Sequence, residues 1–246
     1  MINKLTLQSI ISKYYLGENE SVKWSTRNKL LSIDFQSTNK EVIGNVSYNN
    51  FPMEDGDLAI YNTKKLNNLI GITLGDVLLE TEKTNKVFTK LNISDENFNL
   101  SYALADLLLI SKIGTVSEPD WDVTLNFDLD ENQLGNLIKA KSALAEIDNM
   151  IITTEKDLDG TPICKFTFGD ESGHNNKIMY NMYGNINASD LQLPFNSNMF
   201  KTILNANKDM ESGTLYLSSK GLMKLEFMVG DISSEYFMVR KESTNF

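Results

Sequence analysis

The residue types that most often carry catalysis or bind transition metals are scarce in this 246-residue chain. It has a single histidine, His174, and a single cysteine, Cys164. A structural zinc site takes about four nitrogen or sulfur ligands, which one such chain cannot supply. A Ser-His-Asp triad would have to use His174, which lies in the polar, turn-rich stretch 170–176. We interpret His174 as a solvent-exposed loop residue and expect no catalytic residue, no metal site and no cofactor.

Carboxylates offer the other route to chemistry. Asp120, Asp122, Asp128 and Asp130 flank one predicted strand, and clustered carboxylates can hold Mg²⁺ in a nuclease. Their spacing of two residues instead favours the acidic, solvated edges of a strand. A metal-dependent nuclease therefore stays the alternative of the enzyme class, and cleavage of DNA that requires a divalent metal would support it.

Lysine is the charged residue with an informative distribution. The chain has a net charge of −10 and 33 acidic residues, yet four segments with helical periodicity contain no aspartate or glutamate. These segments carry eight lysines, namely Lys4, Lys13, Lys64, Lys65, Lys139, Lys141, Lys201 and Lys208. Helix surfaces normally mix both signs, because Glu–Lys pairs one turn apart stabilise the helix. Four acid-free helices predict a shared surface that contacts phosphate.

Contacts of this kind would be weak and independent of base sequence, because lysine is a point charge. A ring closed around duplex DNA would be retained by topology, and weak contacts would let it slide. We expect Lys13, Lys201 and Lys208 to project away from their apolar stripes, and Lys141 to extend along one. Arg27 and Lys29 could extend the basic surface, but we favour the interpretation that they solubilise a turn between strands. The plainer alternative is that short helices packed on sheets simply expose lysine.

The periodicity predicts helices at Lys4–Leu16, Asn62–Leu74, Asn132–Ala145 and Asn196–Lys208. Gly17 should end the first helix. Asn62, Asp130 and either Asn196 or Ser197 are the expected caps of the other three. Between the helices the apolar residues alternate, as in Leu31–Phe35, Val42–Tyr48 and Val123–Phe127. The fold class predicted is α+β, with short helices packed on antiparallel sheets.

The order of elements repeats once along the chain. Residues 1–110 and 122–246 each contain two helices at similar spacing among strands, with an apolar turn expected at Leu191–Phe195. Residues 111–121 have the turn chemistry of a connector between two domains. No apolar run approaches the length of about 18 residues that spans a membrane, so a cytoplasmic protein without an anchor is expected.

Three stretches resemble the sliding clamp, the DNA polymerase processivity factor, of T-even-type bacteriophages. Asp57–Tyr61 leads into Leu66, Leu69 and Ile70-Gly71-Ile72, which is similar to a strand and short helix of that family. Leu134–Leu144, with Lys139, is similar to its third inner helix. The ending Glu242-Ser243-Thr244-Asn245-Phe246 is similar to the ending of the family, with Asn245 in place of an acidic residue. Lys141 has no secure basic counterpart.

The resemblance implies a non-enzymatic homotrimeric ring of two-domain subunits, with helices lining the hole and sheet outside. It implies double-stranded DNA, a DNA polymerase, an ATP-driven clamp loader and late-transcription factors as partners, in the cytoplasm of an infected bacterium. Peptide tails of partners would enter a pocket near the domain junction and the C-terminus. The residues expected there are Ile110, Ile113, Pro194 and Phe246, although Ile110 and Ile113 could equally seal the two domains together.

A non-enzymatic, β-rich phage structural or protein-binding module is the other reading that the sequence leaves open. It predicts that the helix lysines are ordinary surface residues. Charge reversal of Lys13, Lys139 and Lys201 discriminates the two, because only a clamp would lose its stimulation of a polymerase.

Overall fold

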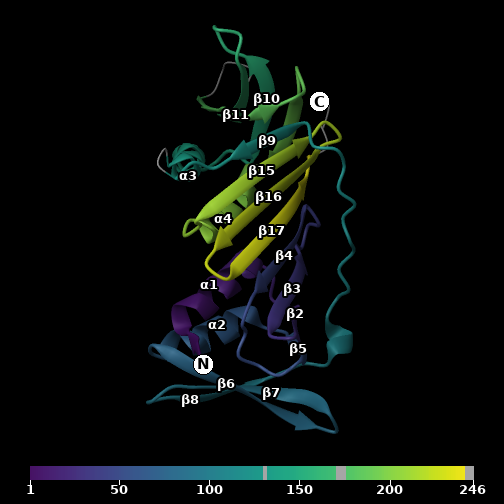
Figure 1. Ribbon diagram of the computed structural model, residues 1–246, viewed down its shortest axis with the longest axis vertical. Coiled ribbons are helices and arrows are strands. Elements are labelled where there is room, and N and C mark those ends of the chain that lie inside the picture. Colours follow the sequence, from purple (N-terminus) through teal and green to yellow (C-terminus); the bar gives the residue numbers. More distant parts are fainter. Residues whose placement is uncertain (130–131, 170–175, 242–246) are drawn as a thin grey trace. The chain divides into compact units, whose positions relative to one another are not determined.

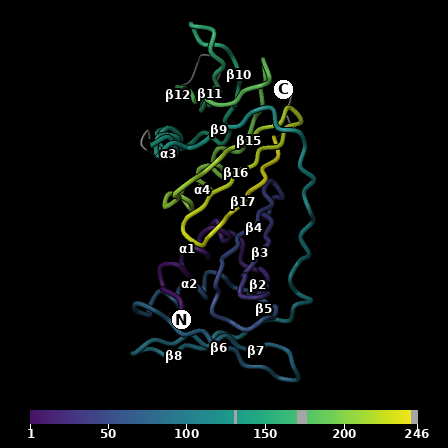
Figure 2. Tube along the Cα trace, viewed as in Figure 1, coloured from purple at the N-terminus to yellow at the C-terminus, as the bar shows by residue number. Residues whose placement is uncertain are grey.

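The computed structural model describes residues 1–129, 132–169 and 176–241. The chain divides into two compact units: unit 1 comprises Met1–Thr115 with Gly230–Ser234, and unit 2 comprises Val116–Val229 with Glu235–Phe246. The division between Thr115 and Val116 falls inside the predicted connector, 111–121. No helix or strand lies between Leu109 and Val123, and Figure 2 shows an extended tube before β9, the strand Val123–Asn126.

Unit 1 contains two α-helices and eight strands (Figure 1). In chain order its elements are β1 (Ile2–Asn3), α1 (Lys4–Tyr15), β2 (Val22–Arg27), β3 (Leu30–Gln36), β4 (Val42–Tyr48), β5 (Gly56–Ile60), α2 (Thr63–Ile72), β6 (Asp76–Thr84), β7 (Val87–Ser94), β8 (Asn99–Ala103) and the 3₁₀ turn η1 (Leu107–Leu109). One antiparallel sheet has the order β1-β6-β7-β8, and β4-β3-β2-β5 form the other set of neighbours. Helix α1 packs against α2 and against β3 and β4.

Unit 2 contains the other two α-helices and nine strands. Its elements are β9 (Val123–Asn126), α3 (Gln133–Ala143), β10 (Asn149–Lys156), β11 (Pro162–Gly169), β12 (Lys177–Met182), β13 (Asn185–Ile186), β14 (Gln192–Asn196), α4 (Ser197–Ala206), β15 (Ser212–Ser218), β16 (Leu222–Val229) and β17 (Ile232–Val239), of which the first residues of β17 belong to unit 1. The strands order as β12-β11-β10-β14 and as β13-β9-β15-β16-β17. Helix α3 packs against α4 and β12, and α4 packs against β10 and β14.

The two units follow one plan of strand, helix, three strands, a returning strand, helix and three strands, to which unit 2 adds the two-residue strand β13 before its returning strand. In unit 1 the returning strand β5 pairs with β2, and β1 pairs with β6. In unit 2 the returning strand β14 pairs with β10 in the same way, and β9 pairs with β15. The prediction of an α+β fold built from two similar domains, each with two short helices on antiparallel sheets, is confirmed.

Equivalent backbone anchors hold the second helix of each unit. In unit 1 the amide and the hydroxyl of Thr63 both donate to the carbonyl oxygen of Glu20, at 3.0 Å each. In unit 2 the hydroxyl of Ser197 donates to Ile147 O at 2.7 Å, and its amide donates to Asp148 O at 3.0 Å. Both anchor residues are fully buried. The segment that follows the first helix of each unit therefore fixes where the second helix starts.

The caps follow the sequence prediction in two cases. The Asn62 side chain accepts a hydrogen bond from Lys65 N, and that of Asn196 accepts from Asn198 N and Met199 N. Asn132 precedes α3 with a left-handed backbone and no side-chain capping bond, and the predicted cap Asp130 lies outside the described residues. Helix α1 ends at a left-handed Leu16, one residue before Gly17.

Several local predictions were wrong. The apolar turn expected at Leu191–Phe195 is strand β14, whose Leu193 and Phe195 are buried in the core. Arg27 is the last residue of β2, and only Lys29 lies in the turn that follows.

Within the described residues, no helix is both long and apolar enough to cross a membrane.

Candidate nucleic-acid interface

All four helices lack acidic residues within their observed bounds. They carry seven lysines, because α4 ends at Ala206 and leaves Lys208 in the following turn. The strands, in contrast, include aspartate and glutamate, such as Asp76, Glu80 and Glu82 on β6 and Glu226 on β16. The strands also carry basic residues, such as Lys83 on β6 and Lys224 on β16. The absence of acidic residues from the helices therefore holds for the elements as folded, whereas the strands carry both signs.

Exposure divides the eight predicted lysines into three groups. Lys64 and Lys65 on α2, Lys139 on α3 and Lys208 after α4 are exposed, and Lys201 on α4 is half-buried. Because α3 packs against α4, unit 2 brings Lys139, Lys201 and Lys208 onto one helix pair. These five lysines are the members of the predicted set whose side chains are at least partly exposed and make no carbonyl contact like that of Lys4.

Lys4 has an intramolecular role. Its ammonium nitrogen lies 2.7 Å from the carbonyl oxygen of Gly71 and 2.6 Å from that of Thr73, at the end of α2. Carbonyl oxygens at the C-terminal end of a helix lack partners within it and favour a cation. Lys4 therefore joins the start of α1 to the end of α2.

Lys13 and Lys141 are both only 1% exposed, each in the last turn of the first helix of its unit. The expectation that Lys13 projects away from the apolar stripe was wrong, since Lys13 is buried with Ile10, Ile11 and Tyr14. Lys141 donates to Leu144 O at 3.1 Å and to Ala145 O at 3.0 Å. Burial, with a smaller contribution from the charge of Lys201, lowers the pKa of Lys141. Both lysines contribute to the interior.

Two acidic side chains lie beside the helix N-termini, where negative charge is favourable. A carboxylate oxygen of Glu20 accepts from the Lys64 amide at 3.0 Å. In unit 2 a carboxylate oxygen of Asp148 accepts from the side-chain amide of Asn198 at 2.6 Å. Both carboxylates accept hydrogen bonds at the start of a helix. The ammonium groups of Lys64 and Lys65 have no acidic partner in the described structure.

A groove of about 670 Å³ lies in unit 1 beside the start of the connector. Its apolar residues come from η1 and the connector, and its polar residues come from β2, β3, β5 and the connector. The lining residues are Lys23, Asp34, Asp57, Leu107, Leu108, Ile110, Ser111, Lys112 and Ile113. Leu108 is 91% exposed, which leaves an apolar side chain available at the rim.

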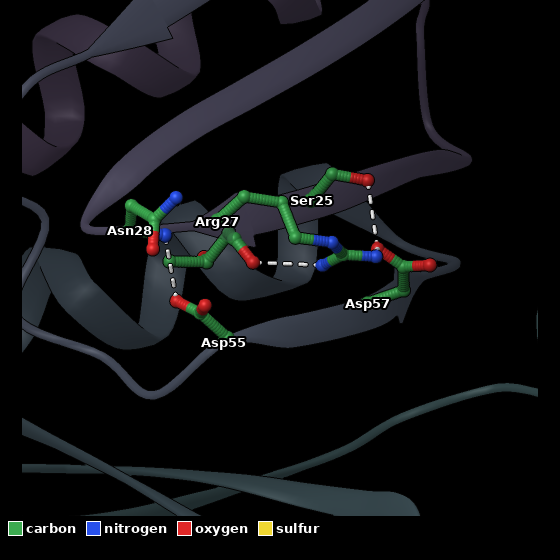
Figure 3. Close-up of polar contacts among 6 residues, drawn as sticks. Ser25, Arg27, Asn28, Asp55 and Asp57 are labelled. Atoms are coloured by element: carbon green, nitrogen blue, oxygen red, sulfur yellow. Dashed lines mark hydrogen bonds and ion pairs between the residues drawn. The ribbon is translucent and has the colours of Figure 1, made fainter.

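The polar wall of this groove is fixed by a small network (Figure 3). One carboxylate oxygen of Asp57 accepts from the Ser25 hydroxyl at 2.8 Å and from the Arg27 guanidinium at 2.9 Å. Arg27 also donates to Thr26 O at 2.7 Å. The charge of Asp57 is thus paired, whereas Lys23 and Lys112 have no ion-pair partner in the described part of the chain.

The predicted partner-pocket residues are only partly brought together. Ile110 and Ile113 both line the groove of unit 1. Pro194 belongs to unit 2, on β14, where its carbonyl oxygen accepts from the Lys241 amide at 2.9 Å. Phe246 lies outside the described residues. Leu107, Leu108 and Lys112 also line the groove but were not predicted, although the apolar run Leu107-Leu108-Leu109 lies directly before the connector.

The described residues contain no group of three or more histidine, cysteine or acidic side chains that could hold a metal ion. Asp122, one of the carboxylates considered for Mg²⁺, accepts from the Ser219 amide at 2.6 Å. His174 and Asp130 lie outside the described residues. Cys164 is fully buried on β11, and its burial raises the pKa of the thiol to about 12.

Comparison with solved structures assigns the fold of this chain to the PCNA type. The solved structure of the C-terminal region of FEN-1 bound to A. fulgidus PCNA is similar to this chain, with a TM-score of 0.78 and 14% identity over 99% of this chain and 98% of that one. The proliferating cellular nuclear antigen of Entamoeba histolytica is similar with a TM-score of 0.76 and 10% identity, over 98% and 96%. No protein-family model and no curated protein sequence matches the chain.

Proposed function

We propose that this protein is a DNA sliding clamp: a non-enzymatic subunit, three copies of which close into a ring around duplex DNA and tether a replicative polymerase. The observation that carries the proposal is the coincidence of two features. The chain has a clamp fold over almost its whole length, and every helix in the described residues lacks acidic residues while the protein has a net charge of −10.

The phosphate contacts in this proposal come from Lys64, Lys65, Lys139, Lys201 and Lys208. So few lysines per subunit give weak, salt-dependent affinity by release of counterions. Weak contacts suit a ring, which is retained by topology and must slide. The acidic residues of the turns and loops would repel DNA from other surfaces and so favour binding through the helices.

Ring closure would use unpaired sheet edges. Strand β8 ends one sheet of unit 1, and β12 ends one sheet of unit 2. An exposed edge carries unpaired amides and carbonyls that can pair with another chain. Head-to-tail pairing of β8 with β12 of the next copy joins different surfaces, and such contacts close into rings when the rotation permits. Three copies is the number that the resemblance to phage clamps implies.

Partners would bind through the groove of unit 1. The A. fulgidus clamp in the similar structure is bound to the C-terminal region of FEN-1. We infer by analogy that short tails of a DNA polymerase and of an ATP-driven clamp loader bind this chain. The resemblance to T-even-type clamps extends the proposal to late-transcription factors and to action in the cytoplasm of an infected bacterium.

The proposal is tested by charge reversal. Lys64, Lys139 and Lys201 are changed to Glu together, and loader-dependent stimulation of DNA synthesis is measured at increasing salt. The control is Lys40→Glu, at an exposed lysine in the turn between β3 and β4. Stimulation should be lost in the triple variant alone. Full activity of the triple variant, at an unchanged melting temperature, would support a β-rich module whose helix lysines are only surface.

The assembly is tested separately by native mass spectrometry. A trimer gives three times the chain mass of 27.8 kDa. A monomer that persists at high protein concentration would refute the ring, and a dimer would keep the topological argument while contradicting the phage-type assembly.

A further inference from the structure

A nearly buried lysine on the sheet of unit 2 is surrounded by three carboxylates. Lys224 on β16 has a side chain that is 9% exposed, and its ammonium nitrogen lies 2.8 Å from Glu118, 2.7 Å from Glu226 and 3.0 Å from Glu235. The same nitrogen lies 5.4 Å from the centre of the Phe237 ring. These hydrogen bonds outweigh the effect of burial and raise the pKa of Lys224. The lysine is therefore a permanent cation.

Only one of the three carboxylates comes from outside the sheet. Glu226 lies on β16 and Glu235 on β17, whereas Glu118 belongs to the connector. Both oxygens of Glu118 are used: one accepts from Lys224, and the other accepts from the indole nitrogen of Trp121 at 3.2 Å. The Trp121 ring in turn packs on the Tyr216 ring of β15, with 5.7 Å between centres. Glu118 thus fastens the connector to the sheet of unit 2.

Glu118 is the principal polar attachment of this segment. Before the connector, the last residue with a backbone hydrogen bond is Ile110, whose amide donates to Leu107 O. The next is Asp122, whose amide donates to Leu217 O. Residues 111–121 make no backbone hydrogen bond between these points among the described residues. A segment without backbone hydrogen bonds is mobile unless side chains hold it.

The start of the same segment forms the apolar wall of the groove in unit 1. Ile110, Ser111, Lys112 and Ile113 line that groove, and Glu118 follows Ile113 by five residues. We propose that the Glu118–Lys224 ion pair positions the connector and thereby sets the wall of the partner groove, so that Glu118 and Lys224 are positioning residues for partner binding. This inference rests on the proposed function for the role of the groove.

The attachment is built so that it can open. Removing one partner from a buried ion pair normally leaves a stranded charge, which is costly. Lys224 avoids this cost, because its ammonium nitrogen also lies 2.7 Å from Glu226 and 3.0 Å from Glu235. These two contacts do not involve Glu118. Three carboxylates around one ammonium group also repel one another. The Glu118 side chain is 44% exposed and can be rehydrated. A partner that needs a wider groove can therefore displace the connector without unfolding the sheet.

The test measures the mobility of the wall without DNA or a partner. Ser111→Cys is labelled with a nitroxide, which Cys164 does not compete for because it is buried. Electron paramagnetic resonance spectra are compared for the labelled parent, Glu118→Gln and Glu226→Gln. The neutral amide that Glu118→Gln introduces has one oxygen, which cannot accept strongly from both Lys224 and Trp121. Glu226→Gln is the matched control, since it removes a carboxylate from the same lysine and leaves the connector attached.

The expected result is a shift toward the narrow-line, mobile component in Glu118→Gln alone, with both variants melting close to the parent. An unchanged spectrum in Glu118→Gln, or an equal shift in Glu226→Gln, would overturn the inference. Loss of DNA retention or of trimer mass in the unsubstituted protein would instead count against the proposed function, because the spin-label readout depends on neither.

Discussion

The ammonium nitrogen of Lys141 lies 3.1 Å from the carbonyl oxygen of Leu144, beyond the end of helix α3. Lys141 and Lys139 stand two residues apart on one helix, yet Lys141 is 1% exposed and Lys139 is exposed. One helix thus carries a buried structural lysine and an exposed lysine that the proposed function assigns to DNA. The two roles can be separated by experiment.

Lys141→Ala should lower the free energy of unfolding by about 1–3 kcal/mol, because it removes a buried stem and the hydrogen bonds that its ammonium group donates to Leu144 O and Ala145 O. Lys139→Ala should change stability by less than about 0.5 kcal/mol. Only Lys139→Ala should flatten the salt dependence of DNA binding. Urea unfolding and binding at several salt concentrations measure both effects. A reduced salt slope in Lys141→Ala would contradict the assignment.

The repeated anchors at the second helices should stabilise the two units alike. Thr63→Val and Ser197→Ala each remove a buried hydroxyl that donates to a backbone carbonyl. Each change should cost about 1–2 kcal/mol in urea unfolding. Ser142→Ala is the control, since the hydroxyl of Ser142 also donates to a carbonyl but is exposed. If Thr63→Val and Ser197→Ala lowered the free energy of unfolding no more than Ser142→Ala does, the anchors would not stabilise the units.

Acid should weaken the attachment of Asp122 to the turn after β15. The amide of Ser219 donates to the Asp122 carboxylate and lowers its pKa. A depressed pKa in the folded state adds stability above the unfolded value of about 3.9, and this stability is lost as the pH falls through the folded value. The free energy of unfolding should fall less between pH 5 and pH 3 in Asp122→Asn than in the parent or in the turn variant Asp159→Asn. Equal losses in all three proteins would contradict this.

Cys164 should report unfolding. The side chain is fully buried, and burial raises the pKa of its thiol to about 12. The thiol should resist alkylation in the folded protein at pH 8, because the thiolate is the reactive form, and should react at once in denaturant. Rapid labelling of the folded protein, measured by mass, would show that β11 opens readily.

The sequence was sufficient to predict the four helices to within two residues of most observed ends. Their apolar spacing is regular, and Asn62 and Asn196 are strong capping residues. Strands with alternating residues, such as β4, were equally clear. Strands β2, β6, β10, β12 and β14 were not predicted, and β14 contains Pro194. Their pairing depends on contacts between distant segments.

The site was less predictable, because exposure depends on what covers each side chain. Lys13 and Lys139 both lie on acid-free helices, and only the fold buries the first. Lys224 occupies a polar position in the alternating sequence of strand β16. Its side chain would be exposed if the connector did not cover it. The groove joins Lys23 on β2 to Ile113 in the connector, residues that nothing in the local sequence relates.

The most direct measurement is topological retention on DNA. The protein is mixed with linear duplex DNA at a concentration that permits trimers, both ends are blocked with a bound protein, and the complex is filtered at high salt, which removes contacts made by charge alone. A ring should stay on the blocked DNA and leave it after a single internal cut. Equal loss from blocked and open DNA, or retention after the cut, would contradict the account.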